Sequence, residues 1–521
     1  QLTITSNIGR RLTNSYNGNV QVLNSSTTDV WRYTKTVNAF SSNFTINNDD
    51  LYIEQTKTLS TNQSGKSFTG AGDFTYTVKS GTDIISLTTA GKVTAKKAGT
   101  AKITVLHKPS GYSNDFSITV RKDAIIVLPG IMGSRIFAKE TFTFQDDIEL
   151  RTFEAGTMLW PPSSELHNIP SVDAKIESLA CSNSGIPLYP TGVKPPRVND
   201  FTVKDECNFG ALDFYQKLYI NLWWEFNENG AYDVILYEYD WRKDPYDTAN
   251  ELDAYINNNC GRVIFVSHSM GGLVSSYYLA KGSAQRARVI KHISLGTPYL
   301  GSEQIPYMMI TGSILGFPED VVVADPVKEI INNLRSIYAL LPPEKYFRPY
   351  VNYNTPDQTN LTYNTYSDTI EGLAEKYSKW NYTLANQSFA HHSLLFDANG
   401  QHITRSVDSY YIIGDGEDTA QRSLVVTSSV ADMMTVILTD ITDDGDQTVT
   451  IHSATINGKT DPNKTFYTYG IEHQSLGGGA DSSSLNRNKV VNFVKAIIND
   501  QVQSMSASTL ANTYNMYRTR Q

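Results

Sequence analysis

The segment from Val263 to Lys281 constrains the fold of this chain more than any other part of the sequence. Its first four residues, Val263–Val266, are apolar and mostly β-branched, as in a buried strand. Small residues follow in Ser267-His-Ser-Met-Gly-Gly272, and from Leu273 onward the apolar residues recur with helical spacing. A strand, a tight turn and a helix in direct succession form the setting of a nucleophile elbow, the turn that presents a catalytic serine.

The residue at the apex of this turn is Ser269, whose hydroxyl would be exposed. The positions two before and two after it must be small, because the strand and the helix would otherwise collide; they are Ser267 and Gly271. The usual pattern has glycine at the first of them, so Ser267 is a departure. The backbone N–H of Met270 would point to the place where an oxyanion forms.

The length and charge of the chain narrow its class. With 521 residues, we expect two or three domains. The net charge of −9, without long basic or acidic runs, argues against nucleic acid as a partner. No window of about 18 apolar residues occurs, so we expect no transmembrane helix. A composition rich in Tyr, Asn, Ser and Thr is common in exported proteins, and a start at Gln1 suggests a processed N-terminus.

Three cysteines cannot all pair within one chain. Cys181 and Cys207 could close one loop, and Cys260, next to the nucleophile strand, is expected to be a buried thiol. The alternative is that all three are reduced.

The first 121 residues are rich in β-pattern. Residues 1–36 are predicted as a β-rich segment without further assignment. Residues 37–121 alternate apolar and polar positions between frequent turns, which predicts a small all-β sandwich. The run Gly91-Lys-Val-Thr-Ala95 followed by Ala98-Gly-Thr-Ala101 and an alternating strand resembles the bacterial immunoglobulin-like group-2 domain. That resemblance implies a secreted or cell-surface bacterial protein and no catalysis by this domain.

From residue 122 onward the pattern changes to an α/β domain. Ala124–Leu128 is a continuous apolar strand, as in a sheet covered on both faces. Further strands at 234–239, 289–295, 410–413 and 434–438 alternate with helices at 213–226, 249–257 and 490–498, which predicts a parallel sheet with crossover helices. This domain is expected to span 122–505, with insertions at about 138–210 and 299–405 and a loose polar tail at 506–521.

The two insertions have different expected structures. Residues 138–210 are predicted to be irregular, with proline breakers and no sheet. The second insertion contains an apolar stretch, Ile305–Phe317, which we interpret as a mobile cap over the site; a packed peripheral helix is the alternative.

A glycine-rich turn, Pro129-Gly-Ile-Met-Gly-Ser134, follows the first strand of the α/β domain. In this fold class the second donor of the oxyanion hole comes from that turn, and the N–H of Ile131 is the candidate. The alternative is a simple turn at the end of a strand.

A serine nucleophile needs a base, and the base needs a carboxylate that holds it in the right tautomer. In this fold class the chain order is serine, acid, histidine. Asp446 lies in a carboxylate-rich turn, and His473 follows 27 residues later with room for one strand between them. Five histidines follow Ser269 at a distance: His391, His392, His402, His452 and His473.

Other residues could also serve as the acid or the base. Asp415 or Asp418 could be the acid, since they also follow a strand. His452 is expected within a strand in a structural role, and His268 is expected to pack under the elbow.

Four segments together resemble the lecithin:cholesterol acyltransferase and lysosomal phospholipase A family, in the family's order over about 123–500. They are Val127–Ser134, Tyr239-Asp-Trp-Arg242, His268–Gly271 with Gly296–Pro298, and Asp444–Val449 followed by Gly470–His473. Leu334–Pro343 also resembles the family's segment beyond the lid. Ser267 and the lid region depart from the family pattern.

The resemblance implies an α/β-hydrolase that acts on acyl esters of lipids, with some members passing the acyl group to an alcohol. It implies Ser269 as nucleophile, Asp446 as acid and His473 as base, with the N–H groups of Ile131 and Met270 as oxyanion hole. It implies neither cofactor nor metal, and it makes Asp240-Trp241-Arg242 a structural element near the site.

We therefore predict a secreted or cell-surface serine hydrolase that cleaves or transfers the acyl group of lipid or other esters. Its lid and its immunoglobulin-like domain would contact a lipid interface or a cell surface. One alternative is a non-catalytic surface-binding protein that uses a hydrolase fold. Another is a polyester or amide hydrolase with the same triad.

Overall fold

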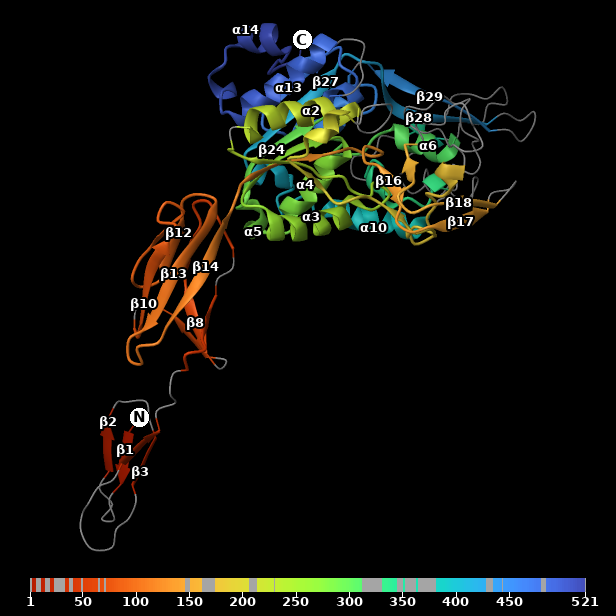
Figure 1. Ribbon diagram of the computed structural model, residues 1–521. Helices are drawn as coiled ribbons and strands as arrows, with labels where there is room; N and C mark the ends of the chain where they lie inside the picture. Colours follow the sequence, from red (N-terminus) through yellow and green to blue (C-terminus); the bar gives the residue numbers. More distant parts are fainter. Residues whose placement is uncertain are drawn as a thin grey trace, which may run out of the picture. The chain divides into compact units, whose positions relative to one another are not determined.

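The computed structural model divides the chain into two compact units, Gln1–Lys122 and Asp123–Gln521 (Figure 1). Each unit is described by itself. The structure describes all residues except 1, 6–10, 15–18, 23–32, 37–40, 48–49, 64–65, 70–71, 146–149, 162–173, 206–212, 229, 312–329, 344–349, 352–361, 364–380, 428–433, 443, 479–483 and 521.

The first unit is built from strands in its described part. It begins with two hairpins, β1 (Leu2–Thr5) with β2 (Arg11–Asn14) and β3 (Asn19–Val22) with β4 (Tyr33–Thr36). Three further sheets follow, in the orders β5-β8-β9, β10-β13-β14-β6 and β11-β12-β7. Their strands are β5 (Thr45–Ile46), β6 (Leu51–Tyr52), β7 (Thr56–Thr58), β8 (Ser60–Gln63), β9 (Lys66–Thr69), β10 (Phe74–Ser80), β11 (Ile85–Leu87), β12 (Lys92–Ala95), β13 (Gly99–His107) and β14 (Ser113–Arg121).

Alternation along these strands creates the core of the first unit. In β13, Ala101, Ile103 and Val105 are fully buried, while the residues between them are exposed or half-buried. Phe74, Tyr76 and Val93 from neighbouring strands join the same apolar cluster. The described residues of this unit are thus compatible with the predicted all-β domain; its assignment as an immunoglobulin-like domain stays a prediction.

The second unit is organised around a seven-stranded sheet in the order β21-β22-β15-β23-β24-β27-β30. All neighbouring strands pair in parallel except the short edge strand β21. The strands are β15 (Ala124–Leu128), β21 (Arg197–Val198), β22 (Asp233–Leu236), β23 (Val263–His268), β24 (Val289–Leu295), β27 (Ser409–Asp415) and β30 (Thr465–Tyr469). The predicted parallel α/β sheet is confirmed, but the strand predicted at 434–438 does not belong to it: it lies in a separate antiparallel hairpin.

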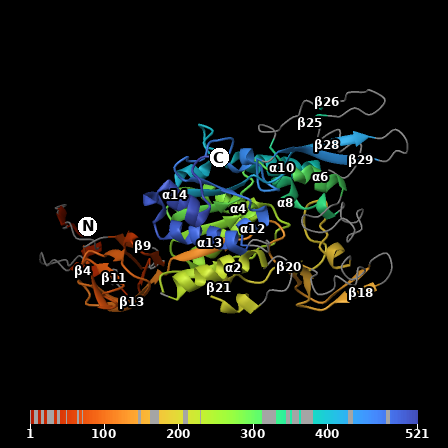
Figure 2. The ribbon, with the colours of Figure 1, turned by 90° about the horizontal axis from the view of Figure 1, so that it is seen from above.

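Helices cover both faces of this sheet (Figure 1 and Figure 2). One face packs on α3 (Pro245–Asn259) and α4 (Met270–Ala280), and the other on α2 (Asp213–Leu222) and α13 (Ser484–Ile498). Successive residues of a strand point to opposite faces, so the buried side chains of β15 and β23 divide between two apolar clusters. Near-continuous apolar strands are what a sheet covered on both faces requires.

The first insertion differs from the prediction. It contains the sheet β19-β16-β20 and the hairpin β17–β18 rather than irregular chain alone. These strands are only two to four residues long, too short for a periodic signal. Their bounds are β16 (Ile136–Ala138), β17 (Phe142–Gln145), β18 (Leu150–Phe153), β19 (Met158–Trp160) and β20 (Thr191–Gly192).

The second insertion is described in part. The helix α6 (Gln304–Thr311) buries Ile305, Met308 and Met309 in the main core, as a packed peripheral helix would. The rest of the apolar stretch, 312–317, lies outside the described residues. Other described elements are α8 (Arg335–Ala339), α10 (Tyr382–Ser393), the pair β25 (Tyr350–Val351) and β26 (Thr362–Tyr363), and the hairpin β28 (Thr419–Thr427) and β29 (Met434–Thr442).

The C-terminal tail is packed on the second unit, against the expectation of a loose tail. Leu510 and Met516 are buried in the core that contains α13, and Tyr517 pairs with Tyr467 of β30. Arg520 forms an ion pair with Asp415, at the end of β27. Two apolar residues in a polar segment give no periodicity, which is why the sequence pattern did not indicate this docking.

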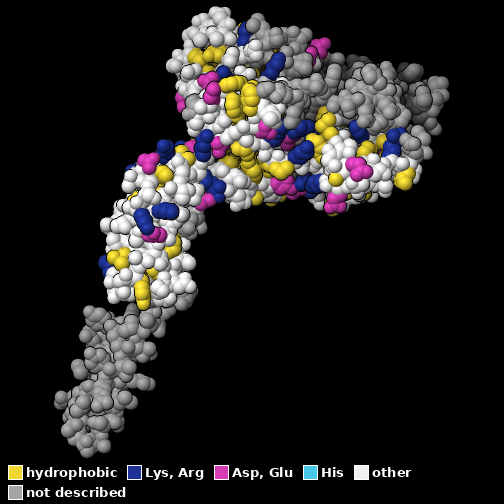
Figure 3. Space-filling view, viewed as in Figure 1, with side chains coloured by type: hydrophobic (Ala, Val, Ile, Leu, Met, Phe, Trp, Pro, Cys, Tyr) yellow, Lys and Arg dark blue, Asp and Glu magenta, His cyan; other side chains and the backbone are white. Residues whose placement is uncertain are grey.

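The surface carries charges of both signs, and two of the three cysteines lie among the described residues. On the face shown in Figure 3, Lys and Arg are interspersed with Asp and Glu. Within the described ranges, no helix has the length and apolar character needed to cross a membrane. Cys181 and Cys260 are buried and form no disulfide with each other, and Cys207 lies outside the described residues. Burial raises the pKa of the Cys181 thiol to about 11.

Candidate active site

Ser269 occupies the sharp turn between β23 and α4, as the sequence pattern predicts. Its backbone has φ 51° and ψ −127°, a conformation that non-glycine residues rarely adopt. Two backbone hydrogen bonds hold the turn: the N–H of Ser269 donates to Leu295 O at 2.9 Å, and its carbonyl accepts from Gly272 N at 2.9 Å. Strain of this kind, fixed by neighbouring elements, is typical of a nucleophile elbow.

The glycines after Ser269 are required by close packing. A Cβ at Gly271 would lie 2.4 Å from the carbonyl oxygen of Leu128, and one at Gly272 would lie 1.9 Å from Oγ1 of Thr297. Both distances are far below van der Waals contact, so a larger residue would push the helix away from the sheet.

Ser267, the departure from the usual glycine, is accommodated by a polar pair. The residue is fully buried, and its Oγ lies 3.1 Å from Oγ of Ser275 on α4. Ser275 Oγ in turn lies 2.9 Å from Nε2 of His292. The extra hydroxyl is therefore hydrogen-bonded rather than stranded in an apolar interior.

Asp446 and His473 are brought together. His473 Nδ1 lies 2.8 Å from Asp446 Oδ2, and the His473 N–H donates to the backbone oxygen of Asp446 at 2.8 Å. The other carboxylate oxygen, Oδ1, accepts from the N–H groups of Thr448 at 3.2 Å and Val449 at 2.8 Å. The carboxylate is almost completely buried, and β30 lies between the two residues in sequence, as expected.

Two glycines allow this pair to approach the sheet. A Cβ at Gly414, at the end of β27, would lie 2.5 Å from Cβ of Asp446. A Cβ at Gly296, directly after β24, would lie 2.8 Å from Asp446 Oδ2 and 3.1 Å from His473 Nδ1. The ends of two parallel strands thus lie directly against the pair, at the edge where ligands bind in such sheets.

His268, the residue before Ser269, lies close to this pair. The centroid of its ring is 4.8 Å from that of the His473 ring. Among the described residues, however, the Ser269 hydroxyl makes no hydrogen bond, so a direct bond to His473 Nε2 is not formed. Such contacts in hydrolases are often long before substrate binds and shorten in the reacting complex.

The two predicted oxyanion donors also lie beside Ser269. Met270 begins α4, and its N–H belongs to the first helical turn, where no partner within the helix exists. The loop that carries Ile131 passes over the serine: a Cβ at Gly130 would lie 3.2 Å from Ser269 Oγ. Neither N–H donates to another residue in the described part of the chain. Both are therefore available to a developing oxyanion.

The competing acid and base have other roles. Asp415 is buried, and Arg520 donates to its carboxylate at 3.1 Å. Asp418 is exposed. His452 lies on the short helix α11 (Ile451–Ala454) rather than in the expected strand, because Thr450 caps that helix by accepting from the N–H of Ser453. His268 packs under the elbow, as predicted.

The segment Tyr239–Arg242 supports the site from behind. Tyr239 OH donates to Pro129 O at 2.6 Å, and Trp241 Nε1 donates to Ser134 O at 3.1 Å, so both ends of the Ile131 loop are held. The guanidinium of Arg242 donates two hydrogen bonds to Asp240, at 2.8 and 2.7 Å, and the backbone N–H of Arg242 donates a third at 3.2 Å. Burial raises the pKa of Asp240, but the Arg242 hydrogen bonds and charge outweigh burial, and the pKa is lowered overall.

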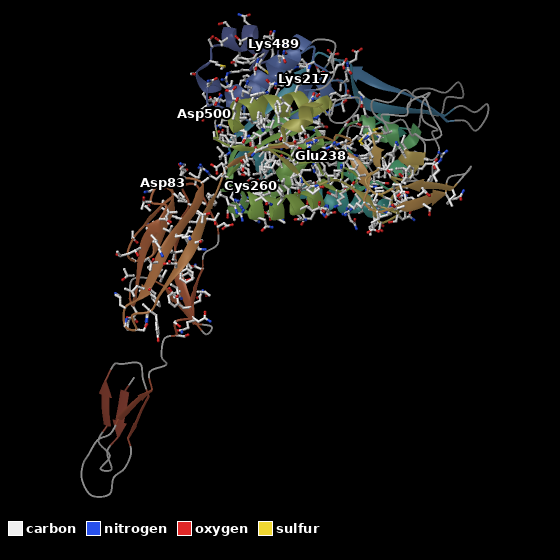
Figure 4. All side chains as sticks on the ribbon, in the orientation of Figure 1. Asp83, Lys217, Glu238, Cys260, Lys489 and Asp500 are labelled. Atoms are coloured by element: carbon white, nitrogen blue, oxygen red, sulfur yellow. The ribbon has the colours of Figure 1, made fainter. Side chains whose placement is uncertain are left out.

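A second ion pair fixes the same loop from the end of β22. Glu238, labelled in Figure 4, accepts from Arg135 Nε at 3.0 Å and from Nη2 at 2.8 Å. Cys260, also labelled, precedes β23 and so lies at the end of that strand opposite Ser269. Within the described ranges, no cluster of three His, Cys, Asp or Glu residues could hold a metal ion.

The sequence pattern missed Tyr215 of α2. Its hydroxyl lies 2.8 Å from both Gly130 N and His268 Nδ1. The apolar residues whose spacing predicted the helix do not include Tyr215. No sequence motif marks a tyrosine that forms a hydrogen bond with a residue 53 positions later.

The family model for lecithin:cholesterol acyltransferase matches residues 228–406. No curated protein sequence matches. A chain in the crystal structure of the Tle4–Tli4 complex is 15% identical with a TM-score of 0.49, covering 74% of this chain and 99% of that one.

Two other solved structures have lower TM-scores. The mature Bacillus licheniformis lipase BlEst2 is 14% identical with a TM-score of 0.27, covering 58% of this chain and 88% of that one. An intimin mutant of EHEC O157:H7 is 16% identical with a TM-score of 0.12, covering 15% and 45%. The match to the lecithin:cholesterol acyltransferase model supports an α/β-hydrolase of the lipid ester hydrolase or acyltransferase type.

Proposed function

We propose that this protein is a serine hydrolase that cleaves acyl esters of lipids, or transfers their acyl group, through an acyl-enzyme on Ser269. The observation that carries the proposal is the buried 2.8 Å contact between His473 Nδ1 and Asp446 Oδ2, at the sheet edge where β23 presents Ser269. A histidine oriented by a carboxylate beside a serine on a strained turn is the arrangement that acyl transfer needs.

The reaction follows from these positions. Ser269 Oγ attacks the ester carbonyl carbon while His473 Nε2 takes its proton, and Asp446 stabilises the imidazolium through Nδ1–H. The N–H groups of Ile131 and Met270 donate to the oxyanion. Collapse expels the alcohol, which receives the proton from His473 Nε2. Water or a second alcohol, deprotonated by His473, then takes the acyl group and frees Ser269.

Fluorophosphonate labelling tests the nucleophile. We expect one adduct per chain, on the peptide that contains Ser269, and none in the Ser269→Ala variant. Ser276→Ala, a buried serine farther along α4 that donates to Gly272 O, is the matched control and should still be labelled. Unchanged labelling of Ser269→Ala, or no labelling of a wild-type chain that also leaves p-nitrophenyl esters intact, would overturn the proposal.

A substrate panel separates the neighbouring functions. Phospholipids, short p-nitrophenyl esters, a polyester and an amide distinguish a lipid esterase from a polyester or amide hydrolase. Adding a long-chain alcohol distinguishes transfer from hydrolysis, because transfer yields a new ester at the expense of free acid. A chain that reacts with none of them and binds a cell surface would support the non-catalytic alternative.

The first unit and the location of the protein belong to the same proposal. Its all-β architecture and its sequence resemblance to a bacterial immunoglobulin-like domain support a secreted or cell-surface protein. Such a unit would hold the hydrolase near a lipid interface or a cell surface.

A further inference from the structure

Three consecutive hydrogen bonds near Ser269 join segments that are distant in sequence. The N–H of Gly130 donates to Tyr215 OH at 2.8 Å. Tyr215 OH lies 2.8 Å from His268 Nδ1, and His268 Nε2 lies 2.8 Å from the backbone oxygen of His473. Tyr215 and His268 are both nearly inaccessible to solvent.

The direction of these bonds is fixed by chemistry. The carbonyl of His473 can only accept, so Nε2 of His268 must carry a proton. In a neutral imidazole Nδ1 is then an acceptor, so the Tyr215 hydroxyl donates to it. The oxygen of Tyr215 still has a lone pair, which accepts from Gly130. In this series of hydrogen bonds, each donor therefore faces an acceptor.

The neutral state of His268 matters because its ring lies beside that of the candidate base. With ring centroids 4.8 Å apart, a charge on His268 would oppose the positive charge that His473 gains during attack. Burial lowers the pKa of His268 well below its ordinary value, and the neighbouring His473 lowers it further. The hydroxyl of Tyr215 supplies a donor to Nδ1 and so favours the unprotonated nitrogen.

These hydrogen bonds connect the oxyanion loop, the nucleophile and the base, which must meet in the reaction. Gly130 precedes the oxyanion donor Ile131, His268 precedes the nucleophile, and the backbone bond ends on the base itself. The packing is tight at Gly477, where a Cβ would lie 3.0 Å from the Tyr215 ring and 3.1 Å from that of His268.

We propose that Tyr215 and His268 are positioning residues, which hold the oxyanion loop, the nucleophile and the backbone of His473 in fixed positions relative to one another. This inference rests on the proposed function. Neither residue is assigned to touch the substrate. Their removal should therefore slow the chemical step without weakening the binding of a small ester.

Tyr215→Phe tests the inference, with Tyr219→Phe as the matched control. Tyr219 lies one turn farther along α2 and is also buried, and its hydroxyl bonds to Asp200 N at 2.8 Å and to Val234 O at 3.4 Å. Each variant loses one hydroxyl with two partners, so each is expected to lower the melting temperature. The Tyr219 bonds lie away from the Ser269 site, so only Tyr215→Phe should slow catalysis.

The readouts are the rate and the final extent of fluorophosphonate labelling, together with kcat and KM for a short p-nitrophenyl ester. For Tyr215→Phe we expect full extent, a labelling rate and kcat lower by about 10- to 100-fold, and an unchanged KM, since a small misplacement of reacting groups costs this much. Tyr219→Phe should keep the wild-type rate within about twofold, the scatter expected when no reacting group moves.

Two outcomes would overturn the inference. One is a Tyr215→Phe variant with wild-type rates; the other is equal rate losses in both variants, or a reduced extent of labelling at an unchanged rate, as loss of folded protein gives. Failure of the proposed function has a different signature, because the wild-type chain itself would then not be labelled at Ser269.

Discussion

Replacing Asp446 with asparagine tests the orientation of the candidate base at the level of single atoms. In the structure Oδ1 of Asp446 accepts from two backbone N–H groups, of Thr448 and Val449, and Oδ2 faces His473 Nδ1 at 2.8 Å. An asparagine must keep its oxygen toward the two N–H donors, because its amide nitrogen cannot accept from them. The amide NH₂ then faces His473 and donates to Nδ1.

The magnitude follows from the resulting tautomer. With Nδ1 as an acceptor, the neutral imidazole carries its proton on Nε2 and cannot take the proton of Ser269. A wrong tautomer of this kind costs about 10⁴-fold in kcat, or about 5 kcal/mol of transition-state stabilisation. Folding should change little at neutral pH, since the side chains have the same shape and the backbone bond between the residues remains.

The assay is kcat for a short p-nitrophenyl ester, divided by the fraction of chains with native circular dichroism. Asp418→Asn is the control, because this exposed carboxylate was the competing acid in the sequence and has none of these contacts; it should retain activity within about twofold. If Asp446→Asn lost less than tenfold, or if Asp418→Asn lost more than Asp446→Asn, the assignment of the acid would be wrong.

Three further predictions concern the frame of the site. Arg520→Met should lower the free energy of unfolding by about 1–3 kcal/mol in urea titration, because it leaves the buried Asp415 without its cationic partner, while the half-exposed guanidinium and the remaining hydrogen bond from the N–H of Gly416 limit the loss; no change would show that the tail does not fix this carboxylate. Burial lowers the pKa of His268, His292, His392 and His402, for His292 to about 3, so the unfolded chain binds their protons first as pH falls. Stability should therefore decrease below about pH 6.5 by up to about 1.4 kcal/mol per pH unit for each histidine, and a flat profile from pH 6.5 to 5 would contradict this. Gly414→Ala should reduce kcat at least about tenfold by displacing Asp446, whose Cβ would lie 2.5 Å from the new methyl group, and wild-type activity would show that the loop adapts.

The sequence indicates those parts of the fold that have a strong local pattern. The run Val263–Val266 and the small residues after it predict β23, the turn at Ser269 and α4, because buried strands and tight turns restrict residue type strongly. The order of serine, acid and histidine likewise selects Asp446 and His473, which lie in contact. The role of Ser269 as nucleophile stays a prediction until it is labelled.

Other features depend on contacts that no local pattern encodes. Tyr215 has the same helical spacing as an ordinary core residue, and only the tertiary structure brings its hydroxyl to His268 and Gly130. Leu510 and Met516 are buried and anchor the polar C-terminal tail, but two isolated apolar residues give no periodic pattern from which this packing could be predicted. The strands of the first insertion, such as β16, are too short to produce an alternating signal.

A crystal structure of the phosphonate adduct would test whether Ser269 is the nucleophile, because the phosphonate is a stable analogue of the tetrahedral intermediate. We expect phosphorus bonded to Ser269 Oγ, the phosphonyl oxygen about 3 Å from the N–H groups of Ile131 and Met270, and Nε2 of His473 turned toward the serine oxygen. An adduct on another residue, or a phosphonyl oxygen turned away from both N–H groups, would contradict this expectation.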